Sequence, residues 1–231
     1  MFSTRSKRLE RIDTGDYTAE EYDRFLEDIR KVNRYTGDNR ALRRSLLQNL
    51  ETADLREFSV LDVGAGSGEL LRTIARFARK RGIDAELAGL ELNSRSAASI
   101  LEESYGFPEI TSVRGNALAL PFADASFDYV ISSLFAHHLT DGQIIEALAE
   151  MSRVAKRNVF VIDLHRHRLA YAAYKCFCVA FGISRLVRED GSLSILRAFR
   201  PYELAAYADS AGFSEISVRR SFPFRLVLTG R

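Results

Sequence analysis

One sequence feature constrains the fold of this chain most. It is an apolar run that leads into a glycine-rich turn and then into a helical pattern. The run extends from Val60 to Leu70 and reads Val-Leu-Asp-Val-Gly-Ala-Gly-Ser-Gly-Glu-Leu. Glycine tolerates positive φ and allows a ligand to approach the backbone closely. A turn that leads from a strand into a helix also directs free backbone N–H groups toward whatever binds there. The run therefore predicts a ligand-binding turn at the start of an α/β domain.

The spacing of the glycines separates two classes of ligand. The dinucleotide fingerprint G-x-G-x-x-G, begun at Gly64, requires glycine at the position that Glu69 occupies. This departure disfavours a nicotinamide-dependent (NAD) oxidoreductase, which stays an alternative on a related sheet.

Downstream of Glu57, apolar strand patterns alternate with amphipathic helical patterns. The predicted strands are 58–63, 86–91, 110–114, 127–133 and 158–164, and the predicted helices between them are 68–81, 94–105 and 141–155. A helix at 201–210 and a hairpin of strands at 214–220 and 223–229 follow. This order predicts an α/β fold with a doubly wound, mostly parallel seven-stranded sheet, helices on both faces and an antiparallel C-terminal strand.

The sequence predicts a single domain, 1–231, with four parts. These are an N-terminal helical extension (1–53), a core (54–164), a helical cap after the fifth strand (165–200) and the final helix with its hairpin (201–231). Within the extension we expect helices at 19–35 and about 39–50, the first capped by Thr18 with Glu21 as its capping-box partner. Within the cap, Glu189-Asp190-Gly191 predicts a turn.

Composition excludes several classes of function. The 231 residues are 46% apolar, which suffices for a full core, but no run of about 18 apolar residues and no signal-peptide pattern occurs. We therefore expect a cytoplasmic protein without stable membrane insertion. The 33 basic and 31 acidic residues nearly balance, and the densest basic group reads as a solvated helix face, so no nucleic-acid partner is expected. That group comprises Arg72, Arg76, Arg79, Lys80 and Arg81.

Polar residues follow the predicted strands at the edge where open α/β sheets bind ligands. Asp62 precedes the glycine turn, and Glu91 ends the second strand, where a carboxylate can accept hydrogen bonds from both hydroxyls of a ribose. Asn116 and Ala117 follow the third strand, and Ser133 ends the fourth. The position of Glu91 predicts a ligand that contains a ribose.

Together these motifs resemble those of class I S-adenosylmethionine (SAM) methyltransferases. The glycine turn matches the pattern D/E-x-G-x-G-x-G, and residues 114–122, Arg-Gly-Asn-Ala-Leu-Ala-Leu-Pro-Phe, resemble a G-D-A and L-P-F pair with Asn116 in place of the aspartate. The resemblance spans about 57–164, with further similarity at 199–213. It is nearest to the small-molecule branch that includes methyltransferases of quinone biosynthesis and of phenolic and polyketide products.

The resemblance implies S-adenosyl-L-methionine as cofactor and S-adenosyl-L-homocysteine as product. It implies that the cofactor lies against Asp62, Gly64, Ala65, Gly66, Gly68, Glu91, Leu92, Asn116, Ala117 and Ser133. An asparagine oxygen can still accept a hydrogen bond from the adenine amino group, although without a charge.

The histidines are the candidate catalytic groups. His137 and His138 follow the fourth strand, and His165 and His167 follow the fifth, directly after Asp163. Imidazole can take a proton near neutral pH, so we predict that His138, or else His137, acts as general base or acceptor contact. The alternatives are orientation of the SAM methionine, packing beneath the cleft, or an equivalent role for the second pair.

Imidazole also binds several metals, but no acidic cluster at ligand spacing accompanies the histidines, so no metal is predicted. Arg166 beside the second pair could instead hold an acidic group on the acceptor.

We expect methyl transfer to a small apolar or aromatic acceptor, first to a phenolic hydroxyl. C-methylation of a quinol-type ring is the second expectation, and a non-catalytic SAM-binding protein is a further alternative. Nitrogen acceptors are disfavoured because Ser-Ser-Leu-Phe stands at 132–135 in place of [DN]-P-P-[YF]. A homodimer is left open. Aromatic side chains are the candidate pocket walls, with core packing as their alternative role: Tyr22, Phe25, Tyr171, Tyr174, Phe177 and Phe181.

Overall fold

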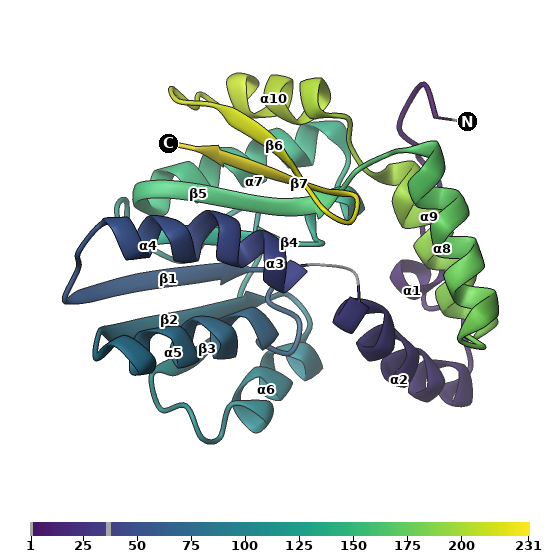
Figure 1. The fold of residues 1–231 in the computed structure, drawn as a ribbon, viewed down its shortest axis with the longest axis horizontal. Helices are drawn as coiled ribbons and strands as arrows, with labels where there is room; N and C mark the ends of the chain where they lie inside the picture. Colours follow the sequence, from purple (N-terminus) through teal and green to yellow (C-terminus); the bar gives the residue numbers. More distant parts are fainter. Residues whose placement is uncertain (1, 36–37) are drawn as a thin grey trace.

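The computed structural model describes residues 2–35 and 38–231 (Figure 1). A seven-stranded sheet in the order β3-β2-β1-β4-β5-β7-β6 forms its centre. The strands are β1 (Glu57–Val63), β2 (Asp84–Glu91), β3 (Ile110–Arg114), β4 (Phe127–Ser133), β5 (Ala155–Leu164), β6 (Ser217–Ser221) and β7 (Arg225–Gly230). Strands β1 to β5 pair in parallel, whereas β7 runs antiparallel to both β5 and β6. The predicted fold class is confirmed.

Helices cover both faces of the sheet. They include α5 (Glu69–Arg81), α6 (Ser94–Glu103), α7 (Asp141–Val154) and α10 (Pro201–Ser210). Successive side chains of a strand point to opposite faces, so Val60 packs in the core cluster that contains Ile74 of α5. Its neighbour Leu61 packs in the other cluster, with Leu148 of α7 and Leu204 of α10. Burial on both faces explains why β1 reads as an unbroken apolar run.

The N-terminal part supplies α1 (Arg11–Thr14), α2 (Ala19–Tyr35), α3 (Asp38–Leu42), a π-helical turn η1 (Arg43–Leu47) and α4 (Gln48–Thr52). Thr18 and Glu21 exchange the predicted capping-box hydrogen bonds, at 3.2 and 3.1 Å. The helices α3 to α4 share a core cluster with α5. A buried ion pair between Asp38 and Arg225 ties α3 to β7 at 2.5 Å.

Two helices inserted after β5, α8 (Arg168–Ala180) and α9 (Arg185–Arg197), form a cap together with α1 and α2. The cap stands beyond the carboxyl ends of the parallel strands (Figure 1). Its own small core contains Val32 of α2 and Val187 of α9. The architecture therefore places N-terminal and late segments of the chain together at the edge where a ligand is expected.

The predicted turn at Gly191 is wrong, because that residue lies inside α9. Gly191 is required for packing: a Cβ atom there would lie 2.1 Å from the hydroxyl oxygen of Tyr174. The neighbouring Asp190 is buried and accepts hydrogen bonds from the backbone N–H groups of Arg11 and Ile12, both at 2.9 Å. The residues that resemble a turn in the sequence therefore hold α1 and α8 against α9.

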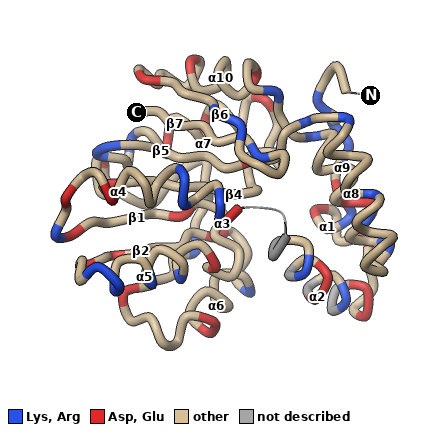
Figure 2. The backbone as a smooth tube through the Cα atoms, in the orientation of Figure 1, with Lys and Arg blue, Asp and Glu red and all other residues tan. Residues whose placement is uncertain are grey.

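Basic and acidic residues are interspersed over the molecule (Figure 2). The predicted solvated basic face needs one correction: Arg72 is buried, and it donates to Glu103 at 3.0 Å. Arg79 is exposed and pairs with Glu109 at 2.7 Å. Among the described residues, no helix is both long and apolar enough to cross a membrane.

Candidate functional site

The glycine turn joins β1 to α5 in a conformation that favours glycine. Gly64, Gly66 and Gly68 have φ of 75°, 59° and 80°, values that other residues adopt at a cost. The N–H of Gly64 donates to the carbonyl of Leu90 at 2.9 Å, which ties the turn to β2. A Cβ atom on Gly64 would lie 2.7 Å from the ring of Phe135, whereas one on Gly66 would meet nothing within 4 Å. The turn is therefore packed at Gly64 and open at Gly66.

Two carboxylates lie beneath this turn. Glu91 accepts a hydrogen bond from the N–H of Gly66 at 2.6 Å, and burial raises its pKa despite that bond. Asp62 is buried, and its Oδ1 has no hydrogen-bond partner within residues 2–35 and 38–231. Burial, with the charge of Glu91 as a smaller cause, raises the pKa of Asp62 to about 8. A buried, unsatisfied carboxyl group beside a second carboxylate favours a cationic ligand.

Arg72 braces the turn from behind, a role that the sequence did not reveal. Its guanidinium donates to the carbonyl of Ser67 at 2.5 Å and to the hydroxyl of Ser104 at 3.3 Å. The helix α5 therefore fixes the turn through a side chain as well as through its own first residues. In the sequence, a buried arginine one helical turn after Gly68 looks the same as an arginine on the solvent-exposed face of the helix.

The other predicted cofactor residues lie around the carboxyl ends of β2, β3 and β4. The N–H of Gly115 donates to the carbonyl of Glu91 at 2.9 Å, which places Asn116 near the end of β2. Asn116 is exposed, and its Oδ1 accepts a hydrogen bond from the N–H of Leu118 at 3.0 Å. Ala117 is buried, Ser133 is half-buried, and Leu92 is 66% exposed. Ala65 donates to the carbonyl of Leu90 at 3.3 Å.

His137 is held by a buried aspartate. It lies in a short 3₁₀ turn, η2 (Ala136–His138), directly beyond β4. Its Nδ1 lies 2.8 Å from Oδ1 of Asp163, and its backbone N–H donates to Oδ2 at 3.2 Å. Burial alone would raise the pKa of Asp163, but His137 and the backbone N–H of Leu164 outweigh burial and lower it. Because an ionised carboxylate only accepts, Nδ1 donates and Nε2 is left for another partner.

His138 is held by a second aspartate, which comes from α1. Its Nδ1 lies 3.1 Å from Oδ1 of Asp13. Burial alone would lower the pKa of His138, but the hydrogen bond to Asp13 and the charge of Glu10 outweigh burial and raise it. The side chain of His138 remains 29% exposed.

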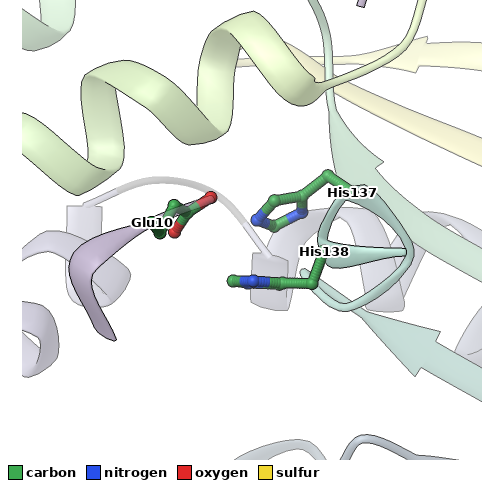
Figure 3. Close-up of side chains that lie close together, drawn as sticks. All are labelled: Glu10, His137 and His138. Carbon is green, nitrogen blue, oxygen red and sulfur yellow. The ribbon is translucent and has the colours of Figure 1, made fainter. Parts of the chain in front are cut away.

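Glu10 completes this group from the segment before α1. Glu10, His137 and His138 each offer one atom that could bind a metal ion, and these three atoms lie within 4.8 Å of one another. The three side chains converge in Figure 3. Glu10 is only 3% exposed, and burial raises its pKa. Its Oε1 has no hydrogen-bond partner in the part of the chain that the structure describes. We call Glu10, His137 and His138 the Glu–His–His cluster.

Arg197 of α9 fastens the two segments that form this cluster. It donates to the carbonyl of His137 at 3.0 Å and to the carbonyl of Arg8 at 2.6 Å. Its Nε lies 3.8 Å from Oε1 of Glu10. Sequence reasoning missed Glu10, Asp13 and Arg197, because nothing in their local pattern distinguishes them from surface charges.

The second histidine pair has structural partners. Burial, together with the charges of His167 and Arg220, lowers the pKa of His165 to about 4, which makes it a weak base. His167 caps α8, since its Nδ1 accepts from the N–H of Leu169 at 3.1 Å. Arg166 is buried and pairs with Glu203 at 2.5 Å, so it does not hold an acidic group on an acceptor.

The predicted aromatic walls lie largely within the cap. Phe25, Tyr174 and Phe177 pack against the cap's own core, so core packing describes them better than a pocket wall does. Phe181 is exposed and stacks on Phe177, and Tyr171 meets Phe2 edge-on. The side chain of Tyr22 lies outside the described part of the structure.

Comparisons with known proteins agree with this geometry. Residues 60–158 match the methyltransferase domain family. An uncharacterized methyltransferase of Bacillus subtilis is 32% identical over 111 residues, 47% of this chain and 41% of that protein. A demethylmenaquinone methyltransferase of Anoxybacillus flavithermus is 35% identical over 133 residues, 53% of this chain and 54% of that protein. The chain thus spans about half the length of these relatives.

The fold has close counterparts among solved structures. Magnesium protoporphyrin IX methyltransferase from Synechocystis, solved with bound S-adenosyl-L-homocysteine, superposes with a TM-score of 0.63 at 14% identity. The match covers 96% of this chain and 99% of that one. Residues 60–158 thus match a methyltransferase domain, and the chain has the fold of the class I, SAM-dependent methyltransferases that its motifs predicted. The open turn at Gly66 and the oxygen of Asp62 that has no partner among the described residues fit a cationic cofactor such as SAM.

Proposed function

We propose that this chain transfers a methyl group from SAM to a small apolar or aromatic acceptor, first of all to a phenolic hydroxyl. The cofactor supplies an electrophilic methyl group on a sulfonium. One observation carries the proposal: beside the glycine turn stands an imidazole pair in which each ring is oriented by its own carboxylate. Phe135, which packs on Gly64, is followed two residues later by His137, so the turn and the pair are adjacent.

The chain's contribution at the cofactor end is binding and positioning. The backbone of Gly64, Ala65, Gly66 and Gly68 receives the methionine end. Asp62 offers its carboxyl group to the ammonium group, whose positive charge favours the ionised carboxylate. Glu91 accepts from the ribose hydroxyls after its bond to the Gly66 N–H is shared or released. The adenine lies against Leu92, Asn116, Ala117 and Ser133. Aligning donor and acceptor in this way removes several kcal/mol of barrier.

His138 is the proposed general base at the acceptor end. With Nδ1 donating to Asp13, its Nε2 can accept the proton of the acceptor hydroxyl, which makes the oxygen a stronger nucleophile. His137 is the proposed neighbour that positions the acceptor, held by Asp163. The half-exposed ring of His138 and the buried ring of His137 suit this division of roles.

C-methylation of a quinol-type ring is the second candidate. It is favoured by relatives named as demethylmenaquinone and 2-phytyl-1,4-naphtoquinone methyltransferases. The same base serves it, because removal of a ring-hydroxyl proton increases the electron density at the neighbouring carbon. That carbon takes the methyl group as the thioether leaves, and it then loses its own proton as the ring regains aromaticity. The two candidates differ only in which atom receives the methyl group.

Incubation with methyl-labelled SAM and a panel of phenols and quinols tests the proposal, with mass spectrometry and NMR locating the methyl group. We expect methylated product from the wild type, and at least about a hundredfold lower turnover from His138→Gln at unchanged SAM affinity. His167→Asn is the control, because asparagine keeps the helix cap. SAM binding without product across the whole panel would instead identify a non-catalytic SAM-binding protein.

A further inference from the structure

We propose that the Glu–His–His cluster is a binding site for a divalent first-row transition metal ion. Two imidazoles and one carboxylate, with one ligand-type atom each inside 4.8 Å of one another, form the kind of donor set that such ions take. The segment before α1 supplies Glu10 and the turn after β4 supplies both histidines. The sequence does not predict this site, because Glu10 is remote from the histidines along the chain.

The surroundings of the two imidazoles are those of metal-binding histidines. A histidine that binds a metal nearly always donates its other ring N–H to a carboxylate or carbonyl. Here both rings do so, His137 to Asp163 at 2.8 Å and His138 to Asp13 at 3.1 Å. Each carboxylate fixes the tautomer in which Nε2 carries a lone pair. Both rings are therefore prepared to bind an ion.

The third proposed ligand, Glu10, has a carboxylate oxygen that is available to bind an ion. Oε1 of Glu10 is buried and has no hydrogen-bond partner among the residues described. Such an atom has lost its hydration without replacement. Its distance of 3.8 Å from Nε of Arg197 permits ionic attraction but not a hydrogen bond. A bound cation would supply the missing partner, and Figure 3 shows the carboxylate directed toward the two rings.

The balance of charge also favours a cation. Among the described residues, the ion pairs and hydrogen bonds of the cluster bring together three carboxylates, those of Glu10, Asp13 and Asp163. Arg197 forms an ion pair with Glu10 there. A cation bound between the rings would be stabilised by these carboxylates in a largely buried place.

A metal here would deepen the proposed function, on which this part of the inference rests. Three protein ligands leave a coordination position open, and a hydroxyl bound there loses its proton more readily. In the metal-bound protein His138 binds the ion and no longer acts as the base. The ion then stabilises the deprotonated hydroxyl of the acceptor in its place.

Titration of the full-length, tag-free protein with Co²⁺, in the absence of SAM and acceptor, tests the site. Co²⁺ bound by nitrogen and oxygen ligands absorbs visible light, so binding is read independently of methyl transfer. We expect one ion per chain, and at least about tenfold weaker binding for Glu10→Gln and His138→Gln. Asp13→Asn should weaken binding about tenfold to a hundredfold through the orientation of His138. His167→Asn is the matched control and should bind as the wild type does.

The outcomes separate this site from the proposed function. Visible absorption in the wild type that both variants lose supports the site, even if no acceptor is ever methylated. Absence of the Co²⁺ spectrum in the wild type, or equal spectra from the wild type and a correctly folded Glu10→Gln protein, would overturn it. Circular dichroism of each variant establishes that it is folded.

Discussion

The Nδ1 atom of His138 lies 3.1 Å from a carboxylate oxygen of Asp13, a residue 125 positions earlier in the chain. The N-terminal segment thus contributes to the candidate active site. It is fastened there by Arg5, whose guanidinium lies over the ring of Phe199 and donates to Asp141 at 2.6 Å. Asp190 caps α1 from the cap helix α9. The site consequently depends on residues outside the segment that carries the methyltransferase motifs.

Replacing Asp13 should therefore affect turnover and not cofactor binding. In Asp13→Asn the amide no longer requires Nδ1 of His138 to donate, so the orientation and tautomer of the ring are lost. We expect kcat to fall about tenfold to a hundredfold, with the Kd of SAM unchanged. Steady-state kinetics with calorimetry measures both. Asp16→Asn is the control, because Asp16 is exposed and takes no part in the site.

Asp62 should make the folded protein less stable as the pH rises. Its pKa is raised from 3.8 to about 8 in the fold, so between these values the folded state holds a proton that the unfolded state releases. The stabilisation is full below the unfolded pKa and is lost as the pH rises through the folded pKa. The free energy of unfolding should fall by roughly 2 to 5 kcal/mol over this range.

Urea unfolding at a series of pH values measures this slope. In Asp62→Asn the slope should become distinctly shallower, with a smaller remainder from Glu91, whose pKa is also raised. An identical slope in wild type and variant would show that Asp62 is ionised throughout.

Gly191 should be intolerant of even one added methyl group. In Gly191→Ala the new Cβ would meet the Tyr174 hydroxyl at 2.1 Å, and relieving that overlap separates α8 from α9. We expect a loss of about 1 to 3 kcal/mol in the free energy of unfolding, measured by urea denaturation. Gly142→Ala in α7, where nothing lies within 4 Å, should be neutral or stabilising by up to about 1 kcal/mol. Equal stabilities for the two variants would contradict the packing argument.

The sheet and its glycine turn are predictable because their signals are local. Apolar runs and the turn glycines place β1 within one residue of its observed start, and they place β3 and β4 at the residues where the structure has them. β5 begins at Ala155, three residues before the predicted start at 158. The prediction started late because Lys156 and Arg157 interrupt the apolar pattern. A register shift between Phe127 and Tyr129 lets these exposed residues continue the strand beside β4.

The cluster around the histidines is not predictable from local pattern. The segment before residue 19 reads as irregular and polar, and α1 has no buried residue that would give it a periodic signal. Glu10 and Asp13 are placed by Arg197 and Asp190, which belong to a helix that the sequence suggested would be broken by a turn. The contacts of Glu10 and Asp13 with the histidines join segments that are far apart in the sequence. The position of each partner therefore depends on how the other segment folds.

Isothermal titration of wild type and Glu91→Ala with SAM, S-adenosyl-L-homocysteine and NAD tests the central claim most directly. We predict that both SAM species bind the wild type and NAD does not, and that Glu91→Ala weakens SAM binding by about 1 to 3 kcal/mol. Glu86→Ala, on the exposed part of the same strand, should leave the affinity unchanged. Binding of NAD with no binding of either SAM species would contradict the account.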